Sequence, residues 1–186
     1  MMKNSEIVST KSVYKGRVIK VRVDTVRTPG DQTAIWDVIE HPGSVSIVPI
    51  DTDDQVLLVR QYRPATGKTL LEIPAGTLEP GESPEVTARR ELREEIGMRA
   101  EWLRSIGSYY LAPGYSSELM HAFAASGLSS APLQQDVDED ISVESIPFGE
   151  LMAQISRREL RDAKTIAAIL LLAHERGVTA PDDRSN

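Results

Sequence analysis

Residues 76–98 read GTLEPGESPEVTARRELREEIGM and join a loop rich in Gly and Pro to an expected helix. Ser83 followed by Pro84 is typical of a helix start, because serine caps the first turn and proline fits its first position. Gly97 is typical of the residue that ends a helix. We therefore expect a helix from about Pro84 to just before Gly97.

Three glutamates share one face of this helix. At about 100° per residue, Glu91, Glu94 and Glu95 fall within an arc of about 100°. The apolar residues fall on the opposite side: Val86, Leu92 and Ile96. Like charges at this spacing destabilise a helix, and the helix dipole disfavours anions in the last turn. The face is therefore either a solvated acidic surface or a site for a hard cation such as Mg²⁺, which prefers several oxygen ligands together.

The composition limits the class of protein. The 186 residues include no Cys, which excludes disulfides, thiolate metal sites and thiol catalysis. No apolar run approaches the roughly 18 residues of a membrane span, and the first residues lack the apolar stretch of a signal peptide. The simplest interpretation is a soluble, cytoplasmic protein with no membrane partner. The formal net charge of −7 argues against a nucleic-acid partner.

Strand and helix patterns lie on both sides of residues 76–98. We expect strands at residues 18–26, 34–40, 46–50, 56–61, 70–73, 100–109, 118–124 and 141–146, and helices at residues 148–155 and 162–174. The strands at 46–50 and 56–61 flank DTDD and are expected to form a hairpin. Strands mixed with helices predict an α/β fold, built as an α/β/α layered sandwich.

The break at His41-Pro42-Gly43 divides the chain. We expect residues 1–42 to form a small N-terminal antiparallel sheet, after a loose start at residues 1–10. Residues 43–178 are expected to form the main domain, and residues 179–186 a flexible tail.

The same glutamates and their spacing also match a known motif. Gly76, then Glu82 after five residues, then RELREEIGM at residues 90–98 resemble the Nudix box of the Nudix hydrolases at every defined position. A chance match has odds of roughly one in a million at average residue usage. The resemblance implies a Nudix fold with a mixed β-sheet, and hydrolysis of a nucleoside diphosphate linked to another moiety.

The resemblance also implies roles for the box residues. Glu91, Glu94 and Glu95 would bind divalent metal ions together with a backbone carbonyl at Ala75, beside the box glycine. Three further residues would support the box helix and its carboxylates: Gly76, Glu82 and Arg90. Ordinary surface ion pairing is the alternative for Arg90.

The flanking sequences resemble the ADP-ribose, or ADP-sugar, pyrophosphatase group of that family. Pro113 follows Gly97 by sixteen residues within LAPGYSSE, and QYRP at 61–64, EIPAG at 72–76 and DAKT at 162–165 agree. A plain turn is the alternative for Pro113. In that group the N-terminal sheet is exchanged across a homodimer, so each active site would contain residues of both subunits.

The resemblance places the substrate as well. Trp36-Asp37 matches a pair that binds adenine, with the indole stacked on the base, although Trp36 would equally fill a subunit interface. Arg63 matches an arginine that binds the diphosphate through parallel hydrogen bonds. His41 stands where that group commonly has an arginine near the adenine, so base recognition would differ there. Two residues complete the expected substrate contacts: Pro113 and Glu118.

Residues 136–140 read DVDED and resemble the loop that supplies the catalytic glutamate, which selects Glu139; a solvated acidic loop is the alternative. In the implied mechanism, Mg²⁺, or Mn²⁺ in its place, polarises the diphosphate and acidifies a water molecule. Glu139 orients or deprotonates that water, and Glu94 is the second catalytic candidate. ADP-ribose would give AMP and ribose 5-phosphate.

Two other functions stay open. A Nudix hydrolase for a GDP-sugar, a dinucleoside polyphosphate or a 5′ RNA end would carry the same box, although the acidic charge weighs against RNA. A Nudix-fold sensor would bind a nucleotide without hydrolysing it. Such sensors generally show a degraded box, whereas all the metal glutamates are present here.

Overall fold

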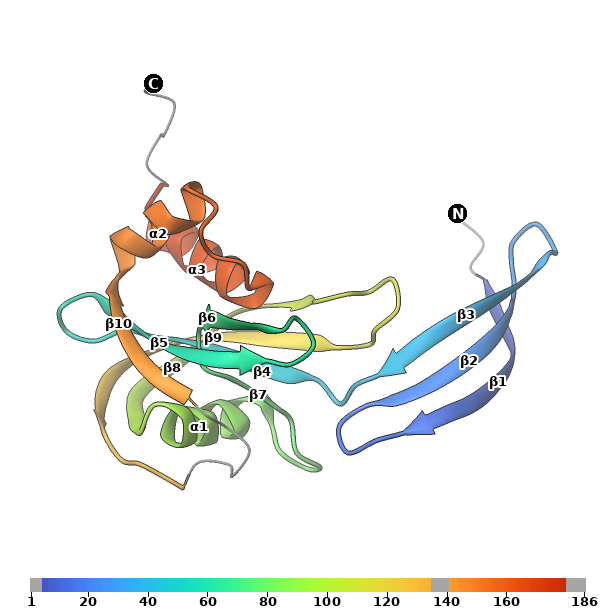
Figure 1. Cartoon of the computed structure of the whole chain (residues 1–186), viewed down its shortest axis with the longest axis horizontal. Coiled ribbons are helices and arrows are strands. Elements are labelled where there is room, and N and C mark those ends of the chain that lie inside the picture. Colours follow the sequence, from blue (N-terminus) through green and yellow to red (C-terminus); the bar gives the residue numbers. More distant parts are fainter. Residues whose placement is uncertain (1–4, 135–140, 180–186) are drawn as a thin grey trace. The chain divides into compact units, whose positions relative to one another are not determined.

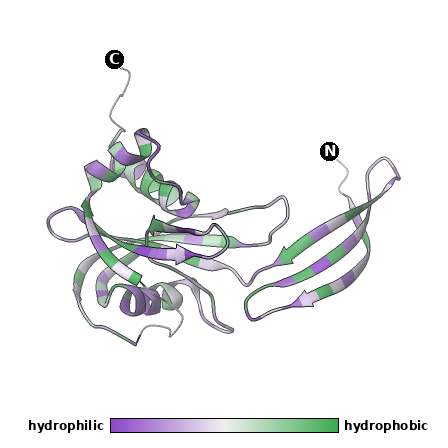
Figure 2. Ribbon diagram, in the orientation of Figure 1, coloured by the Kyte–Doolittle hydropathy of each residue, from purple (hydrophilic) through white to green (hydrophobic). Residues whose placement is uncertain are grey.

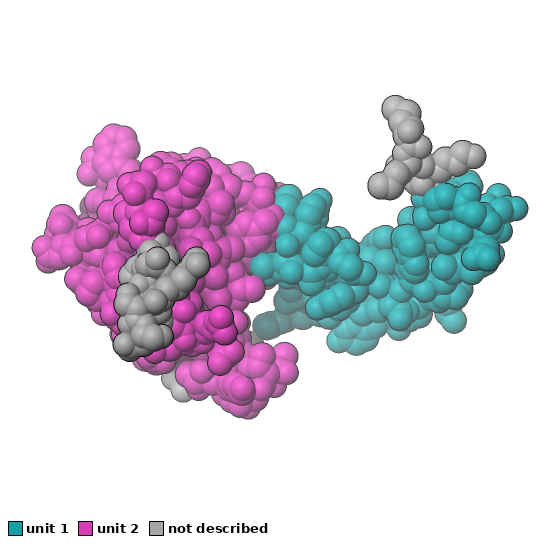
Figure 3. All heavy atoms as spheres, turned by 90° about the horizontal axis from the view of Figure 1, so that it is seen from above, with its two compact units in different colours: residues 1–43, 110–119 teal, residues 44–109, 120–186 magenta. Residues whose placement is uncertain are grey.

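A computed structural model of the chain describes residues 5–134 and 141–179. The chain divides into two units (Figure 3). Unit 1 contains Met1–Gly43 and Tyr110–Leu119, and unit 2 contains Ser44–Tyr109 and Met120–Asn186. The N-terminal residues are therefore grouped with a second segment, Tyr110–Leu119, that is distant from them in the sequence.

Unit 1 is built on an antiparallel sheet of three strands in the order β1-β2-β3: β1 (Glu6–Lys15), β2 (Lys20–Arg27) and β3 (Thr33–Glu40). Hydrophilic and hydrophobic residues alternate along β2 (Figure 2). The segment Tyr110–Leu119 lies along the end of β3, where Ile39 N donates to Tyr115 O at 2.7 Å and Ser117 N donates to Ile39 O at 3.0 Å.

Strand β1 corrects the expectation of a loose start at residues 1–10 as far as residues 6–10 are concerned, and residues 1–4 lie outside the described part of the chain. It begins at Glu6, and all ten of its residues are exposed. A strand with no buried face carries no burial pattern in its sequence, so periodicity could not reveal it. Backbone pairing with β2 holds it, together with a hydrogen bond of 2.8 Å from Thr10 Oγ1 to Asp24 Oδ1.

Unit 2 contains two further sheets. One has the order β10-β5-β6, from β10 (Ile141–Pro147), β5 (Gln55–Arg63) and β6 (Lys68–Glu72). The other has the order β7-β4-β9-β8, from β7 (Ala75–Thr77), β4 (Ser44–Pro49), β9 (Leu119–Ser130) and β8 (Met98–Tyr110). Strand β4 runs parallel to β9 and antiparallel to β7, so this sheet is mixed.

The predicted hairpin of residues 46–61 is wrong. Strands β4 and β5 belong to different sheets, and the isolated bridge between Ile50 and Val56 joins their near ends. The turn itself forms, because Asp51 Oδ1 accepts hydrogen bonds from Asp53 N and Gln55 N at 2.8 and 2.9 Å. Beyond the turn the strands separate, since β4 pairs with β7 and β9 whereas β5 pairs with β6 and β10.

Helices cover both sides of these sheets (Figure 1). Helix α1 (Pro84–Glu95) lies on one side, and α2 (Phe148–Ser156) and α3 (Ala163–Glu175) lie on the other. Strand β4 is buried along its whole length. Its Ile47 belongs to the core cluster of α1 with Leu92, and its Val48 to the cluster of α3 with Ile169. The predicted α/β/α sandwich with a mixed sheet is thus confirmed.

The ends of α1 follow their sequence signals. Ser83 Oγ accepts a hydrogen bond from Val86 N at 3.4 Å, and Pro84 is the first helical residue. Gly97 has a φ of 67°, which L-residues with a side chain rarely adopt.

The helices that the structure describes include none with the length and apolar character needed to cross a bilayer.

Candidate active site

The acidic face of α1 points into unit 2 and not into solvent. Glu91 and Glu95 are 8% and 2% exposed, and Glu94 is half-buried. Val86, which was expected on the packing face, is 53% exposed. The helix is turned so that its buried residues include two glutamates beside Leu92, and it contacts β4 and β7. A solvated acidic surface is therefore the wrong interpretation of this face.

The Glu91 carboxylate occupies the space beside Gly76 of β7 that a side chain at residue 76 would fill. A Cβ atom added at Gly76 would lie 1.8 Å from Glu91 Oε1 and 2.0 Å from its Cδ, far inside any real contact. The carboxylate thus lies directly against the backbone of β7. Only a residue without a side chain allows this approach.

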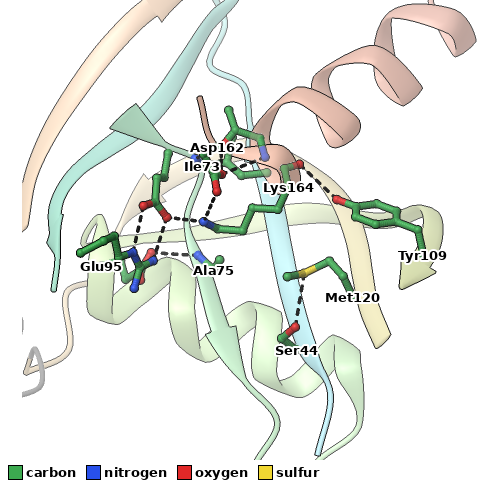
Figure 4. Close-up of polar contacts among 11 residues, drawn as sticks. Ser44, Ile73, Ala75, Glu95, Tyr109, Met120, Asp162 and Lys164 are labelled. Carbon is green, nitrogen blue, oxygen red and sulfur yellow. Dashed lines mark hydrogen bonds and ion pairs between the residues drawn. The ribbon is translucent and has the colours of Figure 1, made fainter. Parts of the chain in front are cut away.

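The neighbouring backbone group holds Glu95. Ala75 N donates to Glu95 Oε2 at 3.0 Å (Figure 4). Ala75 itself pairs with Ser46 of β4. Strand β7 therefore contacts both buried glutamates through consecutive residues. The backbone carbonyl assigned to Ala75 lies on this same short strand.

Arg90 links the carboxylates of the loop to those of the helix. Its Nη1 donates to Glu91 Oε1 at 2.7 Å and to Glu94 Oε2 at 2.8 Å, and its Nη2 donates to Glu82 Oε2 at 3.1 Å. Burial is the largest influence and acts to lower the pKa of Arg90, but the hydrogen bond with Glu82 and the charges of Glu91 and Glu94 outweigh it and raise that pKa. The guanidinium stays charged and fixes three glutamates at once.

The donor set fits a hard divalent cation. Within residues 5–134 and 141–179, no three His, Asp or Glu side chains already surround a metal position. Arg90 instead lies between Glu91 and Glu94. Two of the carboxylates of this cluster are buried, those of Glu91 and Glu95. Several carboxylate oxygens close together are the ligands that Mg²⁺ or Mn²⁺ prefers.

Arg63 lies in a second cluster of charges in unit 2. Its Nε donates to Glu72 Oε1 at 2.9 Å and its Nη2 to Glu72 Oε2 at 2.7 Å. Lys164 of α3 also binds Glu72 Oε2, and it reaches Asp162 Oδ1 at 3.0 Å. Hydrogen bonding to Glu72 raises the pKa of Arg63, so its guanidinium remains charged.

The residues expected to bind the base lie in unit 1. Trp36, Asp37 and Pro113 line a hollow of about 650 Å³ between β3 and the segment Tyr110–Leu119. Trp36 is 49% exposed, so a ligand can reach its side chain. Glu118 is half-buried in the same segment but does not line the hollow. His41 also lies in unit 1, where its N donates to Ser117 Oγ at 3.0 Å.

Unit 2 holds the box glutamates and Arg63, and unit 1 holds the expected base-binding residues. Glu139 lies outside the described residues.

Comparison with known families then decides the class of protein. The model of the NUDIX domain matches residues 40–169, and the model of the nucleoside diphosphate sugar hydrolase N-terminal domain matches residues 6–39. The chain belongs to the Nudix hydrolase family.

The similarity of this Nudix hydrolase to individual relatives extends over most of its sequence. It is 37% identical to the methanol dehydrogenase activator of Bacillus methanolicus and 35% identical to the ADP-ribose pyrophosphatase of Bacillus subtilis (strain 168). Each match spans 167 residues, 89% of this chain and 90% of the relative. The solved structure of an ADP compounds hydrolase matches with a TM-score of 0.84 and 25% identity, over 96% of this chain and 99% of that chain.

The motifs EIPAG and DAKT of this Nudix hydrolase resemble those of the ADP-ribose pyrophosphatase group, but that resemblance assigns no contacts to them. The structure joins the two motifs: Lys164 binds Glu72, and Ile73 N donates to Thr165 Oγ1 at 2.9 Å. Ninety-two residues separate the partners of each contact. No local spacing pattern spans such a distance, so this cluster could not be predicted from the sequence.

Proposed function

We propose that this Nudix hydrolase splits the diphosphate of ADP-ribose and releases AMP and ribose 5-phosphate. The observation that carries the proposal is the pair of buried glutamates on α1, held against the glycine and alanine of β7. The matched N-terminal model is that of nucleoside diphosphate sugar hydrolases, and a relative from Bacillus subtilis is named ADP-ribose pyrophosphatase.

Mg²⁺, with Mn²⁺ as the alternative, is the proposed metal. Glu91, Glu94 and Glu95 would hold it together with the carbonyl of Ala75. When bound, the metal would neutralise the diphosphate and acidify a water molecule. Arg90 keeps the glutamates in position, and Glu82 and Gly76 support that arrangement.

Arg63 is the proposed diphosphate-binding residue of unit 2. Glu72 occupies its Nε and one side of Nη2, and within the described part of the chain Nη1 forms no hydrogen bond. That leaves one edge of the guanidinium to bind phosphate oxygens. Its side chain is 37% exposed, which allows a ligand to reach it.

The hollow of unit 1 is the proposed adenine site. Trp36 would stack on the base, a contact worth about 1–3 kcal/mol. Asp37 would accept a hydrogen bond from the adenine amino group. Pro113 and Glu118 complete the substrate contacts of this unit.

Glu139 is the proposed group that orients or deprotonates the attacking water, and Glu94 is the second candidate. In-line attack on a phosphorus of the diphosphate breaks the bridging P–O bond and places the water oxygen on the phosphate that it attacks. One proton of the attacking water is transferred to the glutamate, and the bridging oxygen stays with the other phosphate.

A homodimer with exchanged N-terminal sheets is part of the proposal. Several large apolar side chains of unit 1 are exposed to water in the single chain. Each is about half exposed or more: Ile7, Val8, Val13, Tyr14, Ile35 and Trp36. Exposed apolar side chains in this number on a small sheet favour contact with another chain. Each site would then combine unit 1 of one subunit with unit 2 of its partner.

Product analysis on a substrate panel tests the proposed function. The full-length enzyme is supplied with ADP-ribose, GDP-mannose, a dinucleoside polyphosphate and capped RNA at fixed Mg²⁺, and products are resolved by chromatography. We expect the highest kcat/KM for ADP-ribose, with AMP and ribose 5-phosphate as products. Preference for another member of the panel would reassign the substrate, and tight nucleotide binding without hydrolysis would indicate a sensor.

A further inference from the structure

Lys164 stands in an unusual position for a lysine. It is the second residue of α3, after the N-cap Asp162, and it is 8% exposed. A cation in the first turn of a helix is disfavoured by the helix dipole, and burial adds a further cost. The stability of α3 therefore does not account for this residue, and its contacts must be considered.

Both ends of Lys164 are fixed (Figure 4). Its Nζ binds Glu72 and Asp162, and its backbone carbonyl accepts a hydrogen bond from Tyr109 Oη at 3.1 Å. The side chain is thereby aimed from α3 at the end of β6. Thr165, the next residue, accepts from Ile73 N at 2.9 Å, which fixes the same end of β6 to α3.

Glu72 is shared between two cations. It is 1% exposed, and its Oε2 accepts hydrogen bonds from Arg63 Nη2 and from Lys164 Nζ. A buried carboxylate attracts a cationic partner strongly, because water does not reach the carboxylate. A second cation on the same oxygen repels the first cation and so offsets part of that attraction. Lys164 therefore weakens the hold of Glu72 on the charge of Arg63.

We propose that Lys164 is a positioning residue for the diphosphate: by sharing Glu72, it leaves more of the positive charge of Arg63 available to the phosphate oxygens of the substrate, which bind the outer edge of the guanidinium. This inference rests on the proposed role of Arg63 in the hydrolysis of ADP-ribose. Lys164 itself contacts no substrate in this account. It acts on the affinity for substrate through Glu72 and Arg63.

Three full-length variants test the proposal: Lys164→Met, Lys164→Arg, and Lys164→Met combined with Glu72→Gln. In Lys164→Met we expect KM for ADP-ribose to rise about tenfold with kcat changed by less than about twofold, because ground-state and transition-state binding are lost together. Lys164→Arg should recover most of the affinity. The double variant should return KM toward the wild-type value, because the neutral amide no longer captures Arg63.

Arg157→Met provides the matched control. It removes one positive charge from an exposed ion pair with Glu150 and Glu159, at the end of α2. We expect its KM to stay at the wild-type value. The double variant also covers the case in which Lys164→Met does not fold, because it leaves no buried carboxylate at residue 72.

Equilibrium binding of ADP-ribose in a chelating buffer, measured by calorimetry, separates this inference from the proposed function. Wild-type protein that binds ADP-ribose but does not hydrolyse it would contradict the function, and weaker binding by Lys164→Met would still support the inference. Unchanged KM and binding in Lys164→Met would overturn it. Additive losses in the double variant would also overturn it, because they indicate a merely structural role.

Discussion

At the residue scale, a substitution of Glu95 distinguishes the effect of this residue on stability from its effect on catalysis. Its Oε2 accepts a hydrogen bond from Ala75 N, and a glutamine oxygen at the same place would keep that bond. Glu95→Gln also removes one charge from a repelling cluster. We expect the free energy of unfolding without metal to be unchanged or slightly raised, and kcat to fall at least about a hundredfold. Thermal denaturation and steady-state hydrolysis of ADP-ribose measure the two effects.

A Glu95→Gln enzyme with more than about a tenth of wild-type turnover would show that the assigned ligand is wrong. A variant that does not fold would show instead that the Glu95 charge is needed for structure.

Gly76 gives a second residue-scale prediction. The Cβ of Gly76→Ala would displace the Glu91 carboxylate, which is the flexible end of a side chain. We expect the fold to persist with a loss of about 1 kcal/mol or less, and Mg²⁺ affinity and kcat to fall at least about tenfold, because a ligand moves out of place. Calorimetry with Mg²⁺ and kinetics measure these changes.

The matched control is Gly149→Ala on α2, where an added Cβ meets no atom within 4 Å. It should keep wild-type activity. Equal Mg²⁺ affinity in Gly76→Ala and wild type would show that the position of the Glu91 carboxylate does not matter for the metal.

At the element scale, α1 shows what local sequence determines. Its cap, its first proline and its terminal glycine fixed the expected limits, because each acts on neighbouring backbone groups. The helical wheel correctly grouped the glutamates, but it does not say which face packs. The partner strands β4 and β7 decide that, and they left Val86 exposed and two glutamates buried.

Elements that depend on distant partners were not predictable. Strand β1 has no buried face, and the divergence of β4 and β5 depends on pairings with β7, β9, β6 and β10. The cluster of Glu72 with Lys164 forms when β6 meets α3. The box residues Gly76, Glu82, Arg90 and Glu91 lie together in the structure, whereas the periodicity placed Val86 wrongly on the packing face of α1.

The junction of β6 and α3 predicts a pH dependence of stability. Burial is the largest influence and acts to raise the pKa of Glu72, but the hydrogen bonds of Arg63 and the charge of Lys164 outweigh it and lower that pKa. Glu72 therefore stabilises the fold above its unfolded pKa of about 4.3, and this contribution is lost as the pH falls through the lower folded pKa.

We expect Glu72→Gln to flatten the fall in the free energy of unfolding between about pH 5 and pH 3, measured by urea denaturation at several pH values. Glu79→Gln, at an exposed site, is the control and should keep the wild-type slope. If the free energy of unfolding of Glu72→Gln falls with pH as steeply as that of the wild type, groups other than Glu72 cause the acid sensitivity.

At the scale of the whole molecule, the exposed apolar side chains of unit 1 predict an assembly. Deletion of residues 1–42 should give a monomer that still binds Mg²⁺ through α1 but loses affinity for ADP-ribose, because Trp36 and Asp37 are gone. Light scattering and calorimetry measure these changes. The variant Trp36→Ala should keep the dimer and lose about 1–3 kcal/mol of ADP-ribose binding.

A wild-type protein that is a fully active monomer at micromolar concentration would rule out the shared site. It would leave the assignment to the Nudix hydrolase family unchanged.

If the carboxylates of α1 hold the divalent cation that hydrolysis of ADP-ribose requires, removal of that cation must stop the reaction. AMP release from ADP-ribose is followed with the full-length enzyme after dialysis against EDTA, and again after Mg²⁺ is restored in excess. We expect a loss of at least about a hundredfold on chelation and full recovery with Mg²⁺. Turnover at the full rate in EDTA, or no AMP release with Mg²⁺, would contradict it.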